Sequence, residues 1–313
     1  MTDHAGAVAA LDCGTNSTRL LIVGPDGDLV DRQMRVTRLG EGVDTNRKLS
    51  AEAMDRTLKV LRDYRRRMDD NGVTRARMVA TSAARDASNS EEFLSAAKEV
   101  TGVEPELLSG AEEGRLSFRG ATSDLPKENG SGDSEELVVD IGGGSTELVV
   151  GVPGGSDETI RVLSLDIGCV RLTERFFKVD PPEAEQITAA RNAVSEELAR
   201  AREFLRVQGG RDRVIGLAGT VSTLGSLSKG FEIYDRDRVH HTVLSAEEVE
   251  DWLGRLASEP ASARAARPGM EPGRADVIVG GVLILSEVMS AFGRGTCLVS
   301  EADILDGMVA GLR

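Results

Sequence analysis

The chain has 313 residues, enough for two domains that each bury a core, and its formal net charge of −14 argues against a general attraction to nucleic acid or to anionic membranes. Its apolar runs are too short to cross a bilayer and its first residues show no signal sequence, so we expect a cytoplasmic protein with neither nucleic acid nor membrane as a partner. Three scattered cysteines argue against disulfides and a thiolate metal site, and three histidines are too few for a histidine-based metal centre.

The chain opens on two short apolar segments, residues 8–11 and 18–23, which predict strands on either side of the sequence Asp12-Cys-Gly-Thr-Asn-Ser. A helix is predicted to begin after Ser50, because apolar residues recur behind it at helical spacing, and Asn71-Gly72 is expected to end it.

A short strand at residues 78–80 leads into Thr81-Ser-Ala-Ala-Arg-Asp-Ala. Small and hydroxyl residues followed by Arg85 are typical of the carboxyl edge of a parallel sheet, which is where ligands bind. A surface turn built on Arg85 and Asp86 is the alternative.

Another strand, residues 104–108, runs into a helix that carries the adjacent carboxylates Glu112 and Glu113. Neighbouring residues cannot share one helix face, so at most one of the two would point into a cleft. Carboxylates that only complement the helix dipole are the alternative reading.

The most informative stretch is Leu137-Val-Val-Asp-Ile-Gly-Gly-Gly-Ser-Thr-Glu-Leu, in which an apolar strand runs into three glycines. Glycines let backbone N–H groups face an anion, and Asp140 and Glu147 are spaced to hold a hydrated divalent cation beside that anion. This pattern predicts a phosphate loop, with a glycine-rich hairpin turn as the alternative.

The same pattern occurs twice. The sequence that starts at Asp12 aligns without a gap with the one that starts at Asp140, because 140 − 12 and 145 − 17 both give 128. Two copies predict two related α/β domains with a phosphate site between them. We place the boundary in the loop-like segment 123–136, which gives domain I as residues 1–122, completed by the C-terminal helix 300–313, and domain II as residues 123–299.

The second half continues with strands and helices. Asp180 is predicted to cap a long helix, Gly219-Thr220 to begin another with N–H groups open to an anion, and Ser245 to form a capping box. Residues 231–242, which include His240 and His241, resist assignment, and a last helix is expected from about residue 301.

Taken in order, these motifs resemble the exopolyphosphatase/guanosine pentaphosphate phosphatase family, which belongs to the acetate and sugar kinase/Hsp70/actin superfamily. The resemblance implies an α/β fold of two duplicated actin-like, ribonuclease H-like domains, with mixed sheets flanked by helices and an active-site cleft between them. It also implies the short, two-domain form of the family, and a homodimer. The motifs that carry the resemblance begin at Asp12, Thr81, Ser109, Asp140, Ile167, Ala218 and Arg274.

The resemblance implies that Glu113 is the general base that activates a water, with Mg²⁺ as the cofactor and K⁺ as a further candidate. Asp140 and Glu147 would hold the metal, and Asp12 is a weaker candidate for it. The expected phosphate-binding residues are Thr15, Asn16, Ser17, Arg85, Gly143, Gly144, Ser145, Gly219 and Thr220.

The leading functional hypothesis is hydrolysis of the terminal phosphoanhydride of inorganic polyphosphate, with short chains as the expected substrate. Hydrolysis of guanosine pentaphosphate is the main alternative. A sugar or acetate kinase and a conformational ATPase are further alternatives from the same superfamily.

Overall fold

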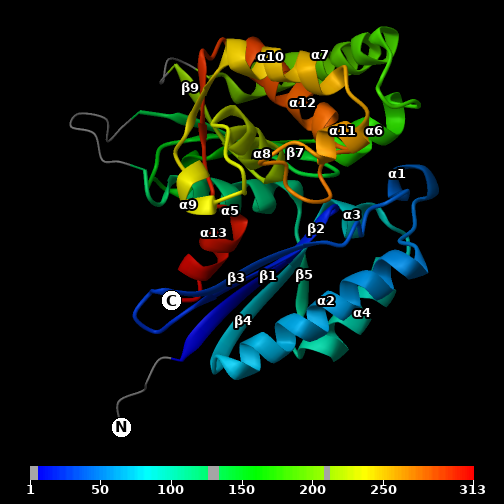
Figure 1. Cartoon of the computed structure of the whole chain (residues 1–313). Helices are drawn as coiled ribbons and strands as arrows, with labels where there is room; N and C mark the ends of the chain where they lie inside the picture. Colours follow the sequence, from blue (N-terminus) through cyan, green and yellow to red (C-terminus); the bar gives the residue numbers. More distant parts are fainter. Residues whose placement is uncertain (1–5, 126–133, 208–211) are drawn as a thin grey trace. The chain divides into compact units, whose positions relative to one another are not determined.

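The computed structural model describes residues 6–125, 134–207 and 212–313, and it divides into two compact units (Figure 1). Unit 1 comprises residues 1–120 and 304–313, and unit 2 comprises residues 121–303. The second boundary therefore lies four residues later than the sequence placed it. Ser300 donates its backbone N–H to the carbonyl of Gly216, which keeps the segment after the last strand with unit 2. The linker expected at 123–136 falls partly outside the described residues.

Unit 1 is built on a five-stranded mixed sheet with the strand order β3-β2-β1-β4-β5. The first three strands form an antiparallel meander, and β4 and β5 continue the sheet parallel to β1. The elements are β1 (Ala7–Cys13), β2 (Ser17–Val23), β3 (Leu29–Val36), α1 (Val43–Asn46), α2 (Ala51–Asp70), β4 (Val73–Ala80), α3 (Ser82–Asp86), α4 (Ser90–Thr101), β5 (Pro105–Leu107), α5 (Gly110–Thr122) and α13 (Ile304–Ala310).

The central strand β1 is buried on both faces because its alternate side chains belong to two different cores. Leu11 joins a core that contains Leu61 of α2, whereas Val8 and Ala10 join a second core with Met308 of α13. Figure 1 shows α2 and α4 lying along one face of this sheet. The carboxyl end of β1 is thereby held firmly, and the first glycine loop follows it directly.

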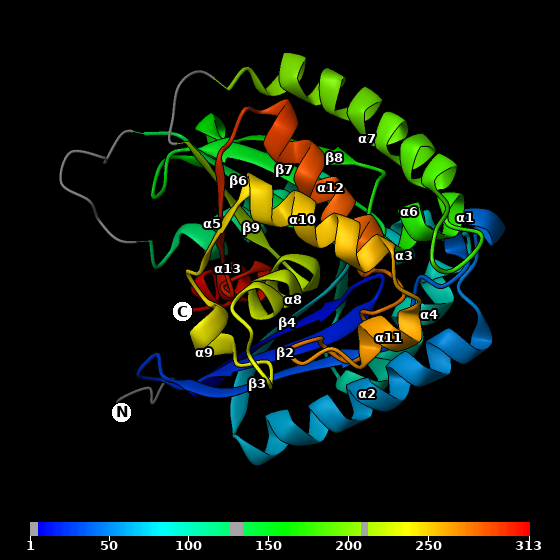
Figure 2. The same ribbon diagram turned by 45° about the horizontal axis from the view of Figure 1, so that its top comes forward.

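Unit 2 contains a six-stranded sheet with the order β10-β11-β9-β6-β7-β8. Its apolar helix α12 packs against α6, α7 and α10, and Figure 2 shows it running between α7 and α10. No helix in the described part of the chain is both long enough and apolar enough to cross a membrane. The elements are β6 (Glu136–Ile141), β7 (Thr146–Gly151), η1 (Asp157–Thr159), β8 (Arg161–Leu165), α6 (Cys169–Phe176), α7 (Ala184–Leu205), β9 (Arg213–Leu217), α8 (Gly219–Ser228), α9 (Arg236–Val239), β10 (Val243–Ser245), α10 (Ala246–Ala257), α11 (Ala261–Ala265), α12 (Ile278–Ala291) and β11 (Thr296–Val299).

The two sheets share one topology, which confirms the predicted fold class of duplicated α/β units with mixed sheets and flanking helices. In unit 1 the meander β1-β2-β3 is followed by β4 parallel to β1, and in unit 2 the meander β6-β7-β8 is followed by β9 parallel to β6. Each glycine loop joins the first two strands of its meander.

Local sequence signals predicted most helix starts correctly. The Ser50 side chain accepts a hydrogen bond from the N–H of Ala53, and Ser245 forms the expected capping box. The prediction for Asp180 was wrong, because Glu183 caps α7 and the Asp180 carboxylate instead accepts hydrogen bonds from Arg264 and a backbone N–H. The last helix begins at residue 304, later than expected.

Candidate active site

The first glycine loop, between β1 and β2 of unit 1, leaves N–H groups open to a ligand. The Gly14 N–H donates to the Ser17 carbonyl at 3.0 Å and closes the turn. The carbonyls of Thr15 and Asn16 accept hydrogen bonds from residues 37–40, but within the described residues the N–H groups of these two residues have no acceptor. The buried Nδ2 of Asn16 also has no partner there. A buried polar group in this state is expected of a residue that contacts a ligand.

At the entrance to this loop, Asp12 is paired with an arginine. Asp12 is 2% exposed, and its Oδ2 accepts hydrogen bonds from Nε and Nη2 of Arg19 at 3.0 and 2.6 Å. The two residues lie opposite each other on β1 and β2. The guanidinium neutralises the carboxylate, so the contact supports a structural role for Asp12 and weakens the case for it as a metal ligand.

The second glycine loop, between β6 and β7 of unit 2, repeats the first. The Gly142 N–H donates to the Ser145 carbonyl at 3.0 Å, and the N–H groups of Gly143 and Gly144 have no acceptor among the residues described. The Gly143 carbonyl accepts hydrogen bonds from Val170 and from the next residue, at the start of α6. The stretch is therefore both a hairpin turn and a loop with open N–H groups, which are the two readings that the sequence allowed.

Two carboxylates lie opposite each other at the entrance to the second loop. Asp140 on β6 pairs in register with Glu147 on β7, and the two are 7% and 1% exposed. Directly opposite residues of an antiparallel pair have Cβ atoms about 5 Å apart. The Glu147 Oε1 also accepts a hydrogen bond from Ser164 at 2.8 Å. Carboxylate oxygens are the ligands that Mg²⁺ prefers in proteins, and this pair offers two buried carboxylates on neighbouring strands.

The predicted base lies in unit 1, near the start of α5. Arg85 Nη1 donates to the Leu108 carbonyl at 2.8 Å and to the Glu113 Oε2 at 3.3 Å, which joins the end of α3 to the first turn of α5. Glu112 points elsewhere and accepts hydrogen bonds from Ser109, which lower the pKa of its carboxyl. The structure thus separates the two glutamates, as their adjacent positions predicted.

The start of α8 in unit 2 carries the predicted phosphate-binding residues Gly219 and Thr220. Ala218, directly before the helix, has φ 69° and ψ 174°, a conformation that is costly for any residue with a Cβ and that is typical of functional sites. The Arg274 guanidinium lies against Gly219, since a Cβ added to Gly219 would lie 2.0 Å from the Cζ of Arg274. Arg274 also pairs with the Glu271 carboxylate at 2.9 Å, so the N–H groups at the helix start are the feature that would favour an anion here.

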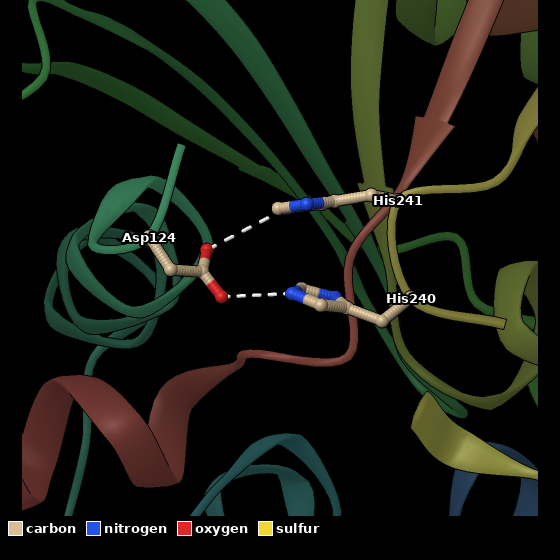
Figure 3. Close-up of side chains that lie close together, drawn as sticks. All are labelled: Asp124, His240 and His241. Carbon is tan, nitrogen blue, oxygen red and sulfur yellow. Dashed lines mark hydrogen bonds and ion pairs between the residues drawn. The ribbon is translucent and has the colours of Figure 1, made fainter. Parts of the chain in front are cut away.

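Asp124, His240 and His241 form a further titratable cluster in unit 2, and their candidate ligand atoms lie within 4.8 Å of one another (Figure 3). The Glu301 N–H donates to Nδ1 of His240, so the ring proton lies on Nε2, where it is donated to Asp124 at 2.7 Å. A metal ion would need the lone pair of that nitrogen. The bonding therefore favours a hydrogen-bonded cluster over a metal site.

The contacts within this cluster shift the pKa values of Asp124 and His241. Partial burial opposes ionisation of Asp124, but the hydrogen bond from His240 and the nearby imidazoles outweigh it and lower the pKa of the Asp124 carboxyl. Burial, and then the neighbouring His240, lower the pKa of His241. The two rings stack with their centroids 3.8 Å apart.

The motifs and their geometry can be compared with known proteins. The profile of the Ppx/GppA phosphatase family matches residues 24–312. The chain belongs to this family. The predicted family is therefore confirmed, and so is the prediction that the protein is an enzyme.

Individual relatives match over nearly the whole chain. Exopolyphosphatase 2 of Mycobacterium tuberculosis is 40% identical over 321 aligned residues, which cover 97% of this chain and 98% of the relative. The crystal structure of an exopolyphosphatase-like protein superimposes with a TM-score of 0.90 at 36% identity and covers 98% of both chains. An exopolyphosphatase from Cytophaga hutchinsonii superimposes with a TM-score of 0.87 at 27% identity, over 98% of this chain and 97% of that protein.

Several contacts of the candidate site residues were not predicted from the sequence. Arg19 contacts Asp12, and Ser164 contacts Glu147. Arg274, which begins one of the family motifs, lies against Gly219. The repeat offered a signal for Arg19, because the offset of 128 residues aligns this arginine with Glu147 in the other copy.

Proposed function

We propose that the enzyme hydrolyses the terminal phosphoanhydride of inorganic polyphosphate and releases orthophosphate. The proposal rests above all on the relation to Exopolyphosphatase 2, which extends over nearly the whole of both chains. The two loops support it, because each offers N–H groups without an acceptor among the described residues, and such groups bind phosphate oxygens.

In the proposed mechanism, Glu113 accepts a proton from a water as the water oxygen attacks the terminal phosphorus. The bridging P–O bond breaks, and its electron pair stays with the shortened chain. Loop N–H groups and the Arg85 guanidinium stabilise the charge on the transferring group, which is the larger part of what phosphoryl transfer requires of a protein. Glu113 belongs to unit 1 and Asp140 to unit 2.

A divalent cation fits the pair formed by Asp140 and Glu147, which offers two buried carboxylates on neighbouring strands. Bound there, Mg²⁺ would supply positive charge to the phosphate oxygens. Mg²⁺, K⁺, a homodimer, a cytoplasmic location and a preference for short chains all stay predictions from the sequence.

The test of the base is the nearly isosteric substitution Glu113→Gln. We expect it to keep the fold and polyphosphate binding and to lower turnover at least ~10²-fold, as the loss of a general base does. Phosphate release measured by a coupled assay gives the turnover, and Glu112→Gln is the matched control. Wild-type turnover in Glu113→Gln would exclude this residue as the base.

The substrate is tested separately, by comparing phosphate release from short polyphosphate, long polyphosphate, guanosine pentaphosphate and ATP with Mg²⁺. We expect polyphosphate to be preferred. A preference for guanosine pentaphosphate would favour the alternative substrate, whose phosphate groups suit a helix N-terminus such as that of α8. ATP turnover that depends on a second substrate would indicate a kinase.

A further inference from the structure

The start of α5 is fixed by a reciprocal set of hydrogen bonds between two exposed residues. The Ser109 N–H and hydroxyl both donate to the Glu112 Oε2, at 2.9 and 2.7 Å. The Glu112 N–H lies 3.3 Å from the Ser109 hydroxyl oxygen, to which it donates. This is a capping box, in which a serine before the helix and a glutamate in its first turn satisfy each other's backbone groups.

The same turn sets the position of Glu113. Its N–H donates to the Ser109 carbonyl at 3.0 Å, which is the first full helical bond of α5. Successive helical residues are about 100° apart around the axis, so the capping of Glu112 directs the next side chain toward another face. On that face Glu113, whose side chain is 12% exposed, meets Arg85.

Arg85 holds the other side of this arrangement. Its Nη1 donates both to the carbonyl of Leu108, the residue directly before Ser109, and to Glu113. The Glu113 carboxylate is therefore aligned by a guanidinium fixed to the end of the strand segment and by a helix start fixed by the capping box. A frayed first turn would release the Glu113 N–H from the Ser109 carbonyl and weaken the alignment of the Glu113 carboxylate with Arg85.

We propose that Ser109 and Glu112 are positioning residues for the hydrolytic reaction, and that they act by fixing the first turn of α5 so that Glu113 keeps its place beside Arg85. The inference rests on the proposed function, in which Glu113 is the base. It assigns different roles to the two adjacent glutamates: Glu112 makes no contact with substrate, and its carboxylate serves the backbone. The hydrogen bonds from Ser109 lower the pKa of Glu112, because they stabilise its ionised carboxylate.

The chain offers conservative and disruptive variants at both positions. Glutamine can replace glutamate in a capping box, and threonine can replace serine before a helix, whereas alanine can do neither. We expect Glu112→Ala and Ser109→Ala to lower kcat about 5- to 10-fold with little change in KM, since loss of a cap is a modest effect. Glu112→Gln and Ser109→Thr should keep kcat within about 3-fold of the wild type, unlike Glu113→Gln.

Amide hydrogen exchange gives a readout that does not depend on activity. Exchange at residues 112–114 should become faster in Glu112→Ala and should stay slow in Glu112→Gln. Unchanged exchange or unchanged kcat in Glu112→Ala would overturn the proposal. Loss of turnover in Glu112→Gln as large as in Glu113→Gln would overturn it too, because it would make the carboxylate itself necessary. A wild-type enzyme inactive on polyphosphate would instead reject the proposed function, while the exchange data would still test the capping.

Discussion

The two glycine loops have the same backbone hydrogen bond and differ in the charged side chains at their entrances. In each, a glycine N–H closes the turn at 3.0 Å, from Gly14 to Ser17 in unit 1 and from Gly142 to Ser145 in unit 2. A Cβ on either glycine would lie 3.1 Å from the carbonyl oxygen that it faces. The offset of 128 residues therefore holds for the hydrogen bonds as well as for the sequence.

The side chains at the entrance of each loop separate the two copies. Asp12 faces Arg19 across the strands and forms an ion pair with it, whereas Asp140 faces Glu147, a second carboxylate. The strand pair at the first loop thus joins a carboxylate to a cation, whereas the pair at the second loop places two carboxylates together, the residue type that divalent cations prefer. The two copies share the backbone of the loop and differ at one position of the pair, Arg19 in the first and Glu147 in the second, and we expect this difference to decide which loop binds the metal.

The largest effect expected from this difference is on metal-dependent turnover. Glu147→Gln removes one of the two carboxylates and should lower kcat about 10³-fold, since a catalytic metal contributes several kcal/mol. Phosphate release measured against Mg²⁺ concentration, with Mg²⁺ binding measured by calorimetry, checks this prediction. Asp12→Asn, in the ion pair of the first loop, is the matched control and should keep its response to Mg²⁺. If Glu147→Gln retained wild-type Mg²⁺ binding, the assignment of the metal to the second loop would be wrong.

The next effect concerns stability in the first loop. Arg19→Met leaves the buried Asp12 without this guanidinium and should lower the free energy of unfolding by about 3 kcal/mol, the cost of breaking a buried pair from one side. Urea denaturation of the variant measures it. The double variant Asp12→Asn with Arg19→Met should recover a large part of the loss, because it leaves no unpaired charge. Equal stability of Arg19→Met and the wild type would mean that the pair is not needed.

The duplicated fold could be predicted from the sequence because the signals that specify it are local. Strand periodicity, glycine spacing and the cap at Ser50 each depend on a few neighbouring residues, and the repeat offset relates the two units directly. The expected N-cap at Asp180 failed for the opposite reason. Arg264, 84 residues further along the chain, binds its carboxylate, and no local pattern reports such a contact.

The candidate site was predicted as a set of residues, but its pairings were not. No sequence pattern placed Arg85 on Glu113 or Ser164 on Glu147, since both contacts join segments that are brought together only by the sheets. His240 remained unassigned for the same reason, because its partners Asp124 and Glu301 lie 116 and 61 residues away. The chemistry of these residues was readable from their types, whereas their geometry required the fold.

A smaller difference between the loops should appear in how tightly each is packed. Gly40 and Gly168 are also 128 residues apart, and each lies close against the glycine loop of its own unit. A Cβ at Gly168 would lie 2.5 Å from the backbone carbonyl of Gly143, whereas one at Gly40 would lie 2.4 Å from the methyl group of Thr15. A side-chain methyl can move and a hydrogen-bonded backbone cannot.

We therefore expect Gly168→Ala to lower the free energy of unfolding by about 2–3 kcal/mol and Gly40→Ala by about 1 kcal/mol. Urea denaturation of both variants gives the comparison. Thr15→Ser removes the crowding methyl group and should restore most of the stability of Gly40→Ala. Equal losses at the two glycines would indicate that the loops are equally rigid.

The smallest expected effect tests the unpartnered amide of the first loop, whose counterpart in the second loop is Gly144. Asn16 is 4% exposed and its Nδ2 has no partner among the described residues, so Asn16→Leu should leave stability unchanged or raise it by up to about 1 kcal/mol. The same change should raise KM for polyphosphate about 10-fold, because a hydrogen bond to a phosphate oxygen is lost. Asn89→Leu is the matched control, since the Asn89 amide bonds both backbone groups of Leu49, and its loss should lower stability without changing KM. An Asn16→Leu variant that is destabilised and keeps its KM would show that the amide serves the fold, and the two loops would then differ in how they bind phosphate as well as in charge.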